Sequence, residues 1–277
     1  SGTVNNSVED FRIGAGGERT TDPWNGWIDE VRLQVGTAPT AAFTVPTVPF
    51  FQGGTCFGLT FARTATGTFV IFAGTDKKLL KWTGTAWNDI SRTTGVAYAA
   101  SATQKWSFAQ FGTTLIATNG VDAVQSINVD SGANFAALAG SPPIANHVIV
   151  IGDFVVLSGL ASNTRKIQWS AINDSTGWTV GTNLSDEQEF PDGGPVIGVA
   201  GGEIGYVVQD RSIRAMQFLP GDTTRIFSFS RLERERGCLP KLGFTTAGGV
   251  LYFLSEDGFN AMAGAQMLDI GADKVDD

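Results

Sequence analysis

A repeat of short apolar segments, each introduced by a glycine-containing turn, constrains the fold of this chain more than any other feature. Their first glycines lie 40 to 50 residues apart. A period of this size is typical of a β-propeller, in which each repeat forms a four-stranded blade around a central axis. The residues from 50 onward therefore predict about five blades. The apolar segments occupy residues 67–72, 112–117, 152–157, 202–208 and 249–254.

Each apolar segment is followed by a polar turn and then by a further strand. The apolar segments are nearly continuous in Val, Ile, Leu and Phe, as expected of strands that are buried on both faces. We therefore expect these five segments to line the propeller axis. The strands after them mostly alternate apolar with polar residues, which is typical of half-buried strands. We predict these third strands at residues 79–82, 124–127, 166–170, 212–216 and 259–262, and fourth strands at 87–90, 135–138 and 226–229.

The predicted fold class is all-β, a propeller of four-stranded antiparallel blades over residues 50–277. Gly or Pro interrupts almost every candidate helix. A β-sandwich is the alternative, but it predicts turns about every 8–12 residues without the longer period. Because only 28 residues follow Gly249, we expect a truncated last unit and an incomplete ring. The open edge at residues 274–277 would be completed by further polypeptide, a partner subunit or a strand from elsewhere.

Residues 1–49 have a different pattern. Residues 11–14 and 24–33, the latter reading Trp-Asn-Gly-Trp-Ile-Asp-Glu-Val-Arg-Leu, resemble the closing strands of a laminin-G or concanavalin-like jelly roll. A Pro/Thr-rich linker follows at residues 37–50. Forty-nine residues are too few for a jelly roll of about eight strands. We therefore expect residues 1–49 to be the end of such a domain plus its linker, within a polypeptide that extends beyond both termini.

The charge balance limits the partners that the chain can bind. It has 19 Lys and Arg against 27 Asp and Glu, a formal net charge of −8 at pH 7. Tight DNA binding depends on clustered Lys and Arg that contact phosphates, so a sequence-specific DNA reader is excluded. Passage of double-stranded DNA without specific binding is permitted, because like charges disfavour adhesion.

One dense charge run stands out at residues 231–236. Its mixed signs fit a solvated edge strand, and they also fit an ion-pair strip that sets the register between subunits. We take this strip as the candidate subunit interface. It comprises Arg231, Glu233, Arg234, Glu235 and Arg236.

The residues able to carry catalysis or bind metals are few. His147 is the only histidine, and we expect it to be an ordinary strand or loop residue. Cys56 and Cys238 form no CxxC pair, and we expect both to be buried free thiols. No apolar run approaches the roughly 20 residues needed to span a bilayer, and the first ten residues have no signal-peptide pattern. The sequence predicts no catalytic, cofactor-binding or metal site, no cofactor and no membrane span.

Two further patterns have enzymatic alternatives. Residues 170–178 are reminiscent of the Asp-box turn of sialidase-type propellers, although the spacing departs from that pattern, and we expect a hairpin there. The adjacent carboxylates Asp186 with Glu187 and Glu256 with Asp257 are not a glycosidase pair, because that chemistry needs two carboxyl groups facing each other across a cleft. We therefore expect the protein not to be an enzyme.

Several short motifs from residue 51 onward resemble the tail hub, or nozzle, family of short-tailed bacteriophages, also called packaged-DNA stabilisation proteins. They are residues 106–112 with 117–119, 167–170 with Trp178, 192–194, 212–214, 236–237, 255–259 and 270–275. The resemblance implies a β-propeller protein of the virion, made in the host cytoplasm. It also implies a homo-oligomeric ring below the portal and adaptor, which forms part of the DNA passage and anchors tail fibres or other appendages.

A carbohydrate-binding module of a virion, or a secreted lectin-like propeller, is the alternative function. Trp24 and Trp27 keep it open, because exposed aromatic side chains can form a platform for sugars. Clustered exposed Trp residues on one concave face would favour this alternative. A secreted propeller enzyme would instead need carboxylates that converge at the mouth of the axis.

Overall fold

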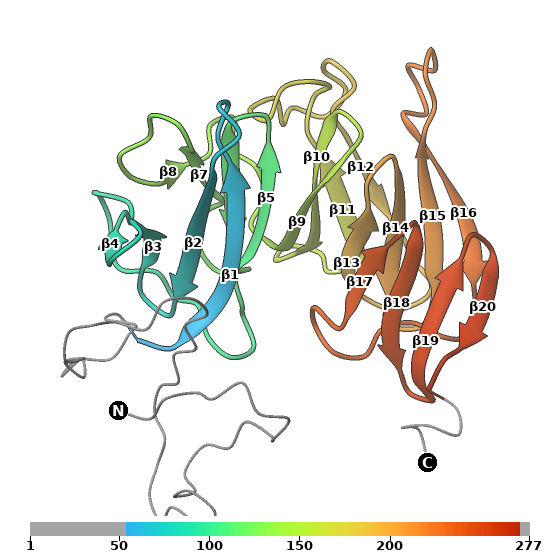
Figure 1. Cartoon of the computed structure of the whole chain (residues 1–277). Helices are drawn as coiled ribbons and strands as arrows, with labels where there is room; N and C mark the ends of the chain where they lie inside the picture. The colour runs from blue at the N-terminus through green and yellow to red at the C-terminus, as the bar shows by residue number, and fades with distance from the viewer. Residues whose placement is uncertain (1–53, 272–277) are drawn as a thin grey trace, which may run out of the picture. The chain divides into compact units, whose positions relative to one another are not determined.

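The computed structural model describes residues 54–271. The chain divides into two units, Ser1–Phe50 and Phe51–Asp277, and the described residues all belong to the second. Its strands form five antiparallel sheets of four strands each, numbered here in chain order (Figure 1). The expectations for residues 1–49 and for the edge at residues 274–277 lie outside the described residues. Residues 54–271 contain no helix, and hence no helix able to cross a membrane.

The strands within each sheet follow the chain in order, so each is a simple meander. Sheet 1 contains β1 (Cys56–Arg63), β2 (Phe69–Thr75), β3 (Leu79–Trp82) and β4 (Trp87–Asp89). Sheet 2 contains β5 (Ser107–Phe111), β6 (Thr114–Thr118), β7 (Gln125–Asn128) and β8 (Ala136–Ala137). Sheet 3 contains β9 (Ala145–Ile151), β10 (Phe154–Leu160), β11 (Lys166–Trp169) and β12 (Asp186–Glu189).

The last two sheets repeat the same arrangement. Sheet 4 contains β13 (Val196–Gly201), β14 (Ile204–Gln209), β15 (Ile213–Phe218) and β16 (Phe227–Glu233). Sheet 5 contains β17 (Phe244–Ala247), β18 (Val250–Ser255), β19 (Gly258–Ala263) and β20 (Gln266–Asp269). The predicted propeller blades are therefore present. Sheet 5 has all four strands, so the expectation of a truncated last unit was wrong.

The identity of the axial strands also differs from the prediction. The strands that meet between successive sheets are the first ones, β1 with β5, β5 with β9, β9 with β13 and β13 with β17. The continuous apolar segments form the second strand of each sheet instead. A second strand has hydrogen-bonded neighbours on both sides, and in the three middle sheets it also has a packed sheet against each face, so β10 is buried at all seven residues. A first strand has one edge without a ladder partner, which permits the mixed sequence that the apolar pattern overlooked.

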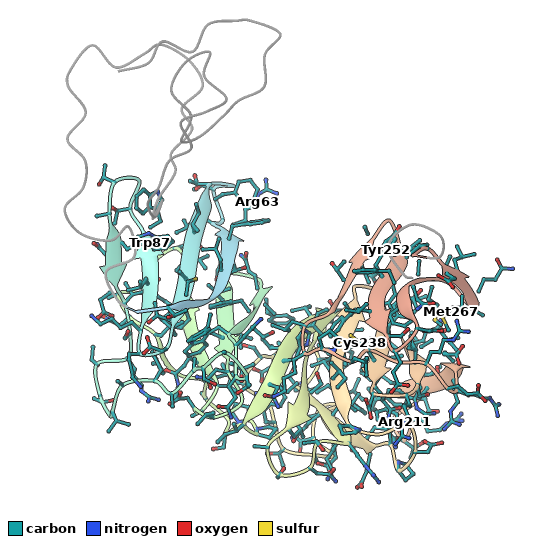
Figure 2. All side chains as sticks on the ribbon, turned by 90° about the horizontal axis from the view of Figure 1, so that it is seen from below. Arg63, Trp87, Arg211, Cys238, Tyr252 and Met267 are labelled. Atoms are coloured by element: carbon teal, nitrogen blue, oxygen red, sulfur yellow. The ribbon has the colours of Figure 1, made fainter. Side chains whose placement is uncertain are left out.

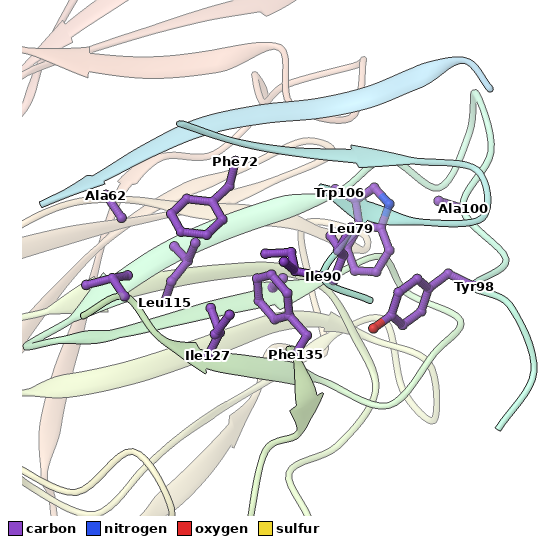
Figure 3. Packing of buried hydrophobic residues seen from close by; sticks show 12 residues of the cluster. Ala62, Phe72, Leu79, Ile90, Tyr98, Ala100, Trp106, Leu115, Ile127 and Phe135 are labelled. Carbon is purple, nitrogen blue, oxygen red and sulfur yellow. The ribbon is translucent and has the colours of Figure 1, made fainter. Parts of the chain in front are cut away.

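The hydrophobic core lies between successive sheets. Between sheets 1 and 2, Phe72 packs against Leu115 and Phe135 in one buried cluster (Figure 3). The Trp106 indole completes this interface and donates from Nε1 to the carbonyl of Thr75 at 2.8 Å. The ring lies over Gly74, where an added Cβ would come 2.2 Å from Trp106 Cδ1. Glycine at this position therefore permits the two sheets to approach each other closely.

Candidate functional site

The predicted charge strip is only partly available to a partner. Arg231 lies on β16, and its guanidinium forms a salt bridge with Asp192. The strand ends at Glu233, whose Oε1 accepts the backbone N–H of Arg234 at 2.8 Å and of Glu235 at 2.9 Å. Partial burial raises the pKa of Glu233, but these backbone donors outweigh it and the net pKa lies below the usual value. Strand β16 therefore ends at Glu233, and the next three residues lie outside any strand.

The other residues of the strip differ in their contacts. Arg236 Nε lies 3.0 Å from Asp257 Oδ2, which connects the end of sheet 4 to the β18–β19 turn of sheet 5. Arg234 and Glu235 are exposed, and within residues 54–271 their side chains make no ion pair. Arg236 is exposed as well but pairs with Asp257, so Arg234 and Glu235 are the exposed residues of the candidate interface that make no ion pair in the described part of the chain.

An ion cluster, partly exposed at Asp192, adjoins the strip, and the charge pattern alone did not reveal it. The Asp192 carboxylate pairs with both Arg214 and Arg231. Arg214 also donates to Gln209 Oε1 at 3.0 Å and lies over the Phe190 ring, 5.2 Å from its centroid. Burial lowers the pKa of Arg214. The cluster fastens the loop between sheets 3 and 4 to strands β15 and β16 of sheet 4.

A cavity of about 380 Å³ opens where the first strands of sheets 2 to 5 begin. Its polar lining comes from Thr103 and Lys105 before β5, Asn146 on β9 and Lys241 before β17. Lys241 Nζ donates to the carbonyl of Thr103 at 3.1 Å and lies 3.4 Å from Asn146 Oδ1. The Lys241 side chain thus connects the start of sheet 5 to the entrances, meaning the starts of the first strands, of sheets 2 and 3. No local pattern in the sequence indicates this cavity, because Lys241 and Thr103, which meet at it, are 138 positions apart.

The outward side of sheet 1 exposes a group of large apolar side chains. Strand pairing places Phe61 opposite Ile71, and both point away from the buried cluster that contains Phe72. The rings of Phe61 and Phe69 meet edge to face, 5.6 Å apart. The exposed fractions are 63% for Leu59, 68% for Phe61, 64% for Phe69 and 39% for Ile71. We call these four residues the sheet 1 end face.

The outward side of sheet 5 has the same character. Pairing places Tyr252, Ala261 and Leu268 side by side across three strands, opposite the face whose Leu251 and Phe253 are buried against sheet 4. Figure 2 shows Tyr252 and Arg63 on sheets at the two ends of the series. The large exposed apolar residues on this side are Tyr252, Phe259, Leu268 and Ile270. We call these four residues the sheet 5 end face.

The single histidine is an interior residue. His147 lies on β9 with its ring 5.4 Å from that of Phe244 on β17, and its buried Nδ1 has no hydrogen-bond partner among residues 54–271. Burial lowers the pKa of His147 to about 4, so the ring is neutral near pH 7. Cys238 is buried, and burial raises its pKa to about 11. The expectation that Cys56 is buried was wrong, because it is exposed at the start of the edge strand β1.

The turn at residues 170–178 lies between β11 and β12. Asp174 accepts hydrogen bonds from the backbone N–H of Thr176 at 2.8 Å and its hydroxyl at 2.6 Å, and these bonds lower the pKa of the carboxyl group. Trp178 Nε1 donates to the carbonyl of Ser175 at 2.8 Å. Asp174, Thr176 and Trp178 thus close the turn, as the hairpin interpretation predicts.

The adjacent carboxylates are dispersed over the sheets. Glu187 on the outer strand β12 pairs with Lys166 at 2.6 Å. Asp257 lies in the β18–β19 turn, where hydrogen bonding to Ser255 lowers the pKa of its carboxyl group. Within residues 54–271, no group of three or more His, Cys, Asp or Glu has the arrangement needed to hold a metal ion.

Comparisons with known proteins identify the fold and no family. No family profile and no curated protein sequence matches the chain. The extracellular domain of the two-component system BT4673 of B. thetaiotaomicron matches with a TM-score of 0.51 and 10% identity, over 78% of this chain and 28% of that one. YCF48 bound to a D1 peptide matches with a TM-score of 0.48 and 12% identity, over 78% of this chain and 68% of that one.

BamB of Moraxella catarrhalis has a TM-score of 0.43 and 14% identity, over 78% of this chain and 63% of that one. This chain therefore spans little more than a quarter of the BT4673 domain and about two thirds of the other two. At identities this low the likeness concerns the fold alone. Together with the five meandering sheets, the likeness to the BT4673 domain identifies a β-propeller domain with four-stranded antiparallel blades.

Proposed function

We propose that this chain is a structural component of a short-tailed bacteriophage tail, in which its sheets form part of a ring around the DNA passage. The observation that carries the proposal is the pair of apolar end faces on sheets 1 and 5. Burying apolar surface is worth about 25 cal/mol per Å², and contiguous exposed apolar patches mark protein–protein contacts. In the tail, sheets of neighbouring subunits cover these two faces.

The geometry within the chain supports this pairing. In sheet 2, successive residues of β6 point to opposite sides, so Leu115 joins the cluster shared with sheet 1 and Ile116 the cluster shared with sheet 3. The sheet 1 end face corresponds to the first of these sides, and the sheet 5 end face to the second. Sheet 5 of one copy therefore offers the kind of surface that sheet 1 of the next copy leaves open, which is a head-to-tail contact.

The assignment to a phage tail rests on the sequence resemblance. Its motif residues hold sheet interfaces: Trp106 closes the space between sheets 1 and 2, and Trp169 on β11 meets Phe227 of sheet 4 at 5.0 Å. Arg214 and Asp192 of the resembling segments belong to the ion cluster that fastens the loop before β13 to sheet 4. The net charge of −8 is compatible with DNA passing without being held.

The first test measures assembly of the whole chain by light scattering and analytical ultracentrifugation at micromolar concentrations. We expect wild type to self-associate and both Phe61→Lys and Leu268→Lys to be monomeric, because each variant places a charge in a buried apolar contact. Val96→Lys is the matched control, since Val96 is 80% exposed in the connection between sheets 1 and 2. A monomeric wild type, or unchanged assembly in both end-face variants, contradicts the ring.

The tail assignment has its own test. Mass spectrometry of purified virions is expected to detect this chain with the tail proteins, and its absence from virions would refute the assignment. Duplex DNA is expected not to bind below micromolar concentrations, because the described sheets offer no continuous basic stripe. Tight, salt-sensitive DNA binding contradicts the passage model while leaving the end-face contact intact.

A further inference from the structure

We propose that the cavity at the entrances of sheets 2 to 5 binds a small organic anion, one with a carboxylate or phosphate group attached to a short apolar portion. At about 380 Å³ the cavity has the size of a small-molecule site. Four consecutive sheets contribute to it, so the site exists only when they are assembled. This inference does not depend on the proposed tail function.

The charge of the cavity lining differs from that of the chain as a whole. Lys105 and Lys241 both line it, and none of the lining residues is acidic. The acceptors of Lys241 are a backbone carbonyl and an amide oxygen, which leave its positive charge unneutralised. Lys105 is exposed and makes no hydrogen bond or ion pair within the described part of the chain. A protein of net charge −8 thus has, at one cavity, two ammonium groups that pair with no carboxylate in the described residues, and these groups favour an anion.

The backbone that presents Lys241 is strained. Residues 240–243 form a turn closed by the N–H of Gly243 and the carbonyl of Pro240 at 3.0 Å. Leu242 occupies the position that favours glycine, with φ at +60°, a conformation that a bulky side chain rarely adopts. Such strain is found preferentially at binding sites, where surrounding structure holds it. Here the backbone N–H of Leu239 donates a hydrogen bond to the carbonyl of Leu254 at 3.0 Å, and this bond fixes the turn to sheet 5.

The remaining walls define the rest of the ligand. Ala102, Ile197, Pro240 and Leu242 contribute apolar surface, and the hydroxyl of Thr103 and the amide of Asn146 are neutral polar groups beside the lysines. A charged group can therefore lie between the ammonium groups while a short hydrocarbon portion contacts Ile197 and Leu242. The cavity is bounded by the connections before β5 and β17 and by residues of strands β9 and β13.

The test is titration calorimetry of the full chain with two separate probes, succinate and inorganic phosphate. We expect saturable binding of at least one probe, weakened about tenfold by Lys105→Met and by Lys241→Met, the effect of losing one charge-assisted hydrogen bond. Lys77→Met is the matched control, because it removes the same charge from an exposed turn in sheet 1. Which probe binds more tightly distinguishes carboxylate from phosphate recognition.

The proposal is overturned if neither probe binds saturably, or if the Lys105→Met and Lys241→Met double variant binds as tightly as wild type. It is also overturned if a DNA duplex binds at these lysines more tightly than either probe, since the ligand is then a nucleic acid. Lys241→Met also removes the contact to Thr103, so thermal unfolding is measured for every variant. If Lys241→Met fails to fold, Lys105→Met decides the question, because Lys105 makes no bond within the described chain.

Discussion

The interface between sheets 3 and 4 and the end face of sheet 1 are built from the same kind of residue with opposite outcomes. Phe154 on β10 is fully buried, with its ring 5.1 Å from Phe218 and 5.0 Å from Phe227 of the next sheet. Phe61 on β1 touches Phe69 of its own sheet and is 68% exposed. Each phenylalanine lies on an apolar face of its strand. An apolar propeller face therefore becomes part of the core only when a neighbouring sheet covers it.

The largest expected effect is on the buried side of this comparison. Phe154→Ala removes a ring from a packed interface and leaves a cavity, so the free energy of unfolding is expected to fall by about 3–5 kcal/mol. Phe61→Ala, in the monomeric chain, is expected to change it by less than about 0.5 kcal/mol. Urea unfolding of both variants measures the difference. Similar losses for the two variants would mean that the sheet 1 end face is already covered in the isolated chain.

An effect of intermediate size on stability is expected when the pH is lowered, because His147 is buried whereas the end faces are exposed. The pKa of His147 falls from 6.5 to about 4 on folding, so the unfolded chain binds its proton first as the pH drops. Stability is therefore complete above about pH 6.5 and decreases toward pH 4, by about 3 kcal/mol from this residue.

The control for the pH effect is His147→Leu, which removes the titrating group. Chemical unfolding at pH 7 and pH 4 is expected to show a smaller pH-dependent loss in the variant than in wild type. Equal losses in the two proteins would show that His147 is accessible to solvent, contrary to its buried position between β9 and β17.

The smallest effect on folding is expected at the charged strip. Arg236→Glu breaks a half-exposed pair with Asp257, which is worth about 0.2–1 kcal/mol after solvent screening. Arg234→Glu breaks no pair in the described chain and leaves folding stability unchanged. If the strip is a subunit contact, as the sequence predicts, Arg234→Glu lowers the assembly constant in ultracentrifugation. Unchanged assembly would leave the end faces as the contact surfaces and remove the strip.

The sequence by itself was sufficient for the period, the fold class and the position of most strands. The third strand predicted at residues 79–82 is β3, and the fourth predicted at 87–90 is β4 at Trp87–Asp89. These features depend on alternation within a strand and on turn residues beside it, such as Gly67 and Gly112, which adopt positive φ. Such signals are local, so they can be read from neighbouring residues.

Only the tertiary structure decided which strands lie at the axis, how the charges pair and where the cavity is. The continuous apolar segments proved to be second strands, since burial on both faces is a property of a strand's neighbours and not of its own residues. Asp192 meets Arg214 and Arg231 across 22 and 39 positions, and Lys241 reaches Thr103 across 138. No short-range pattern encodes such distances, because they are set by how successive sheets stack.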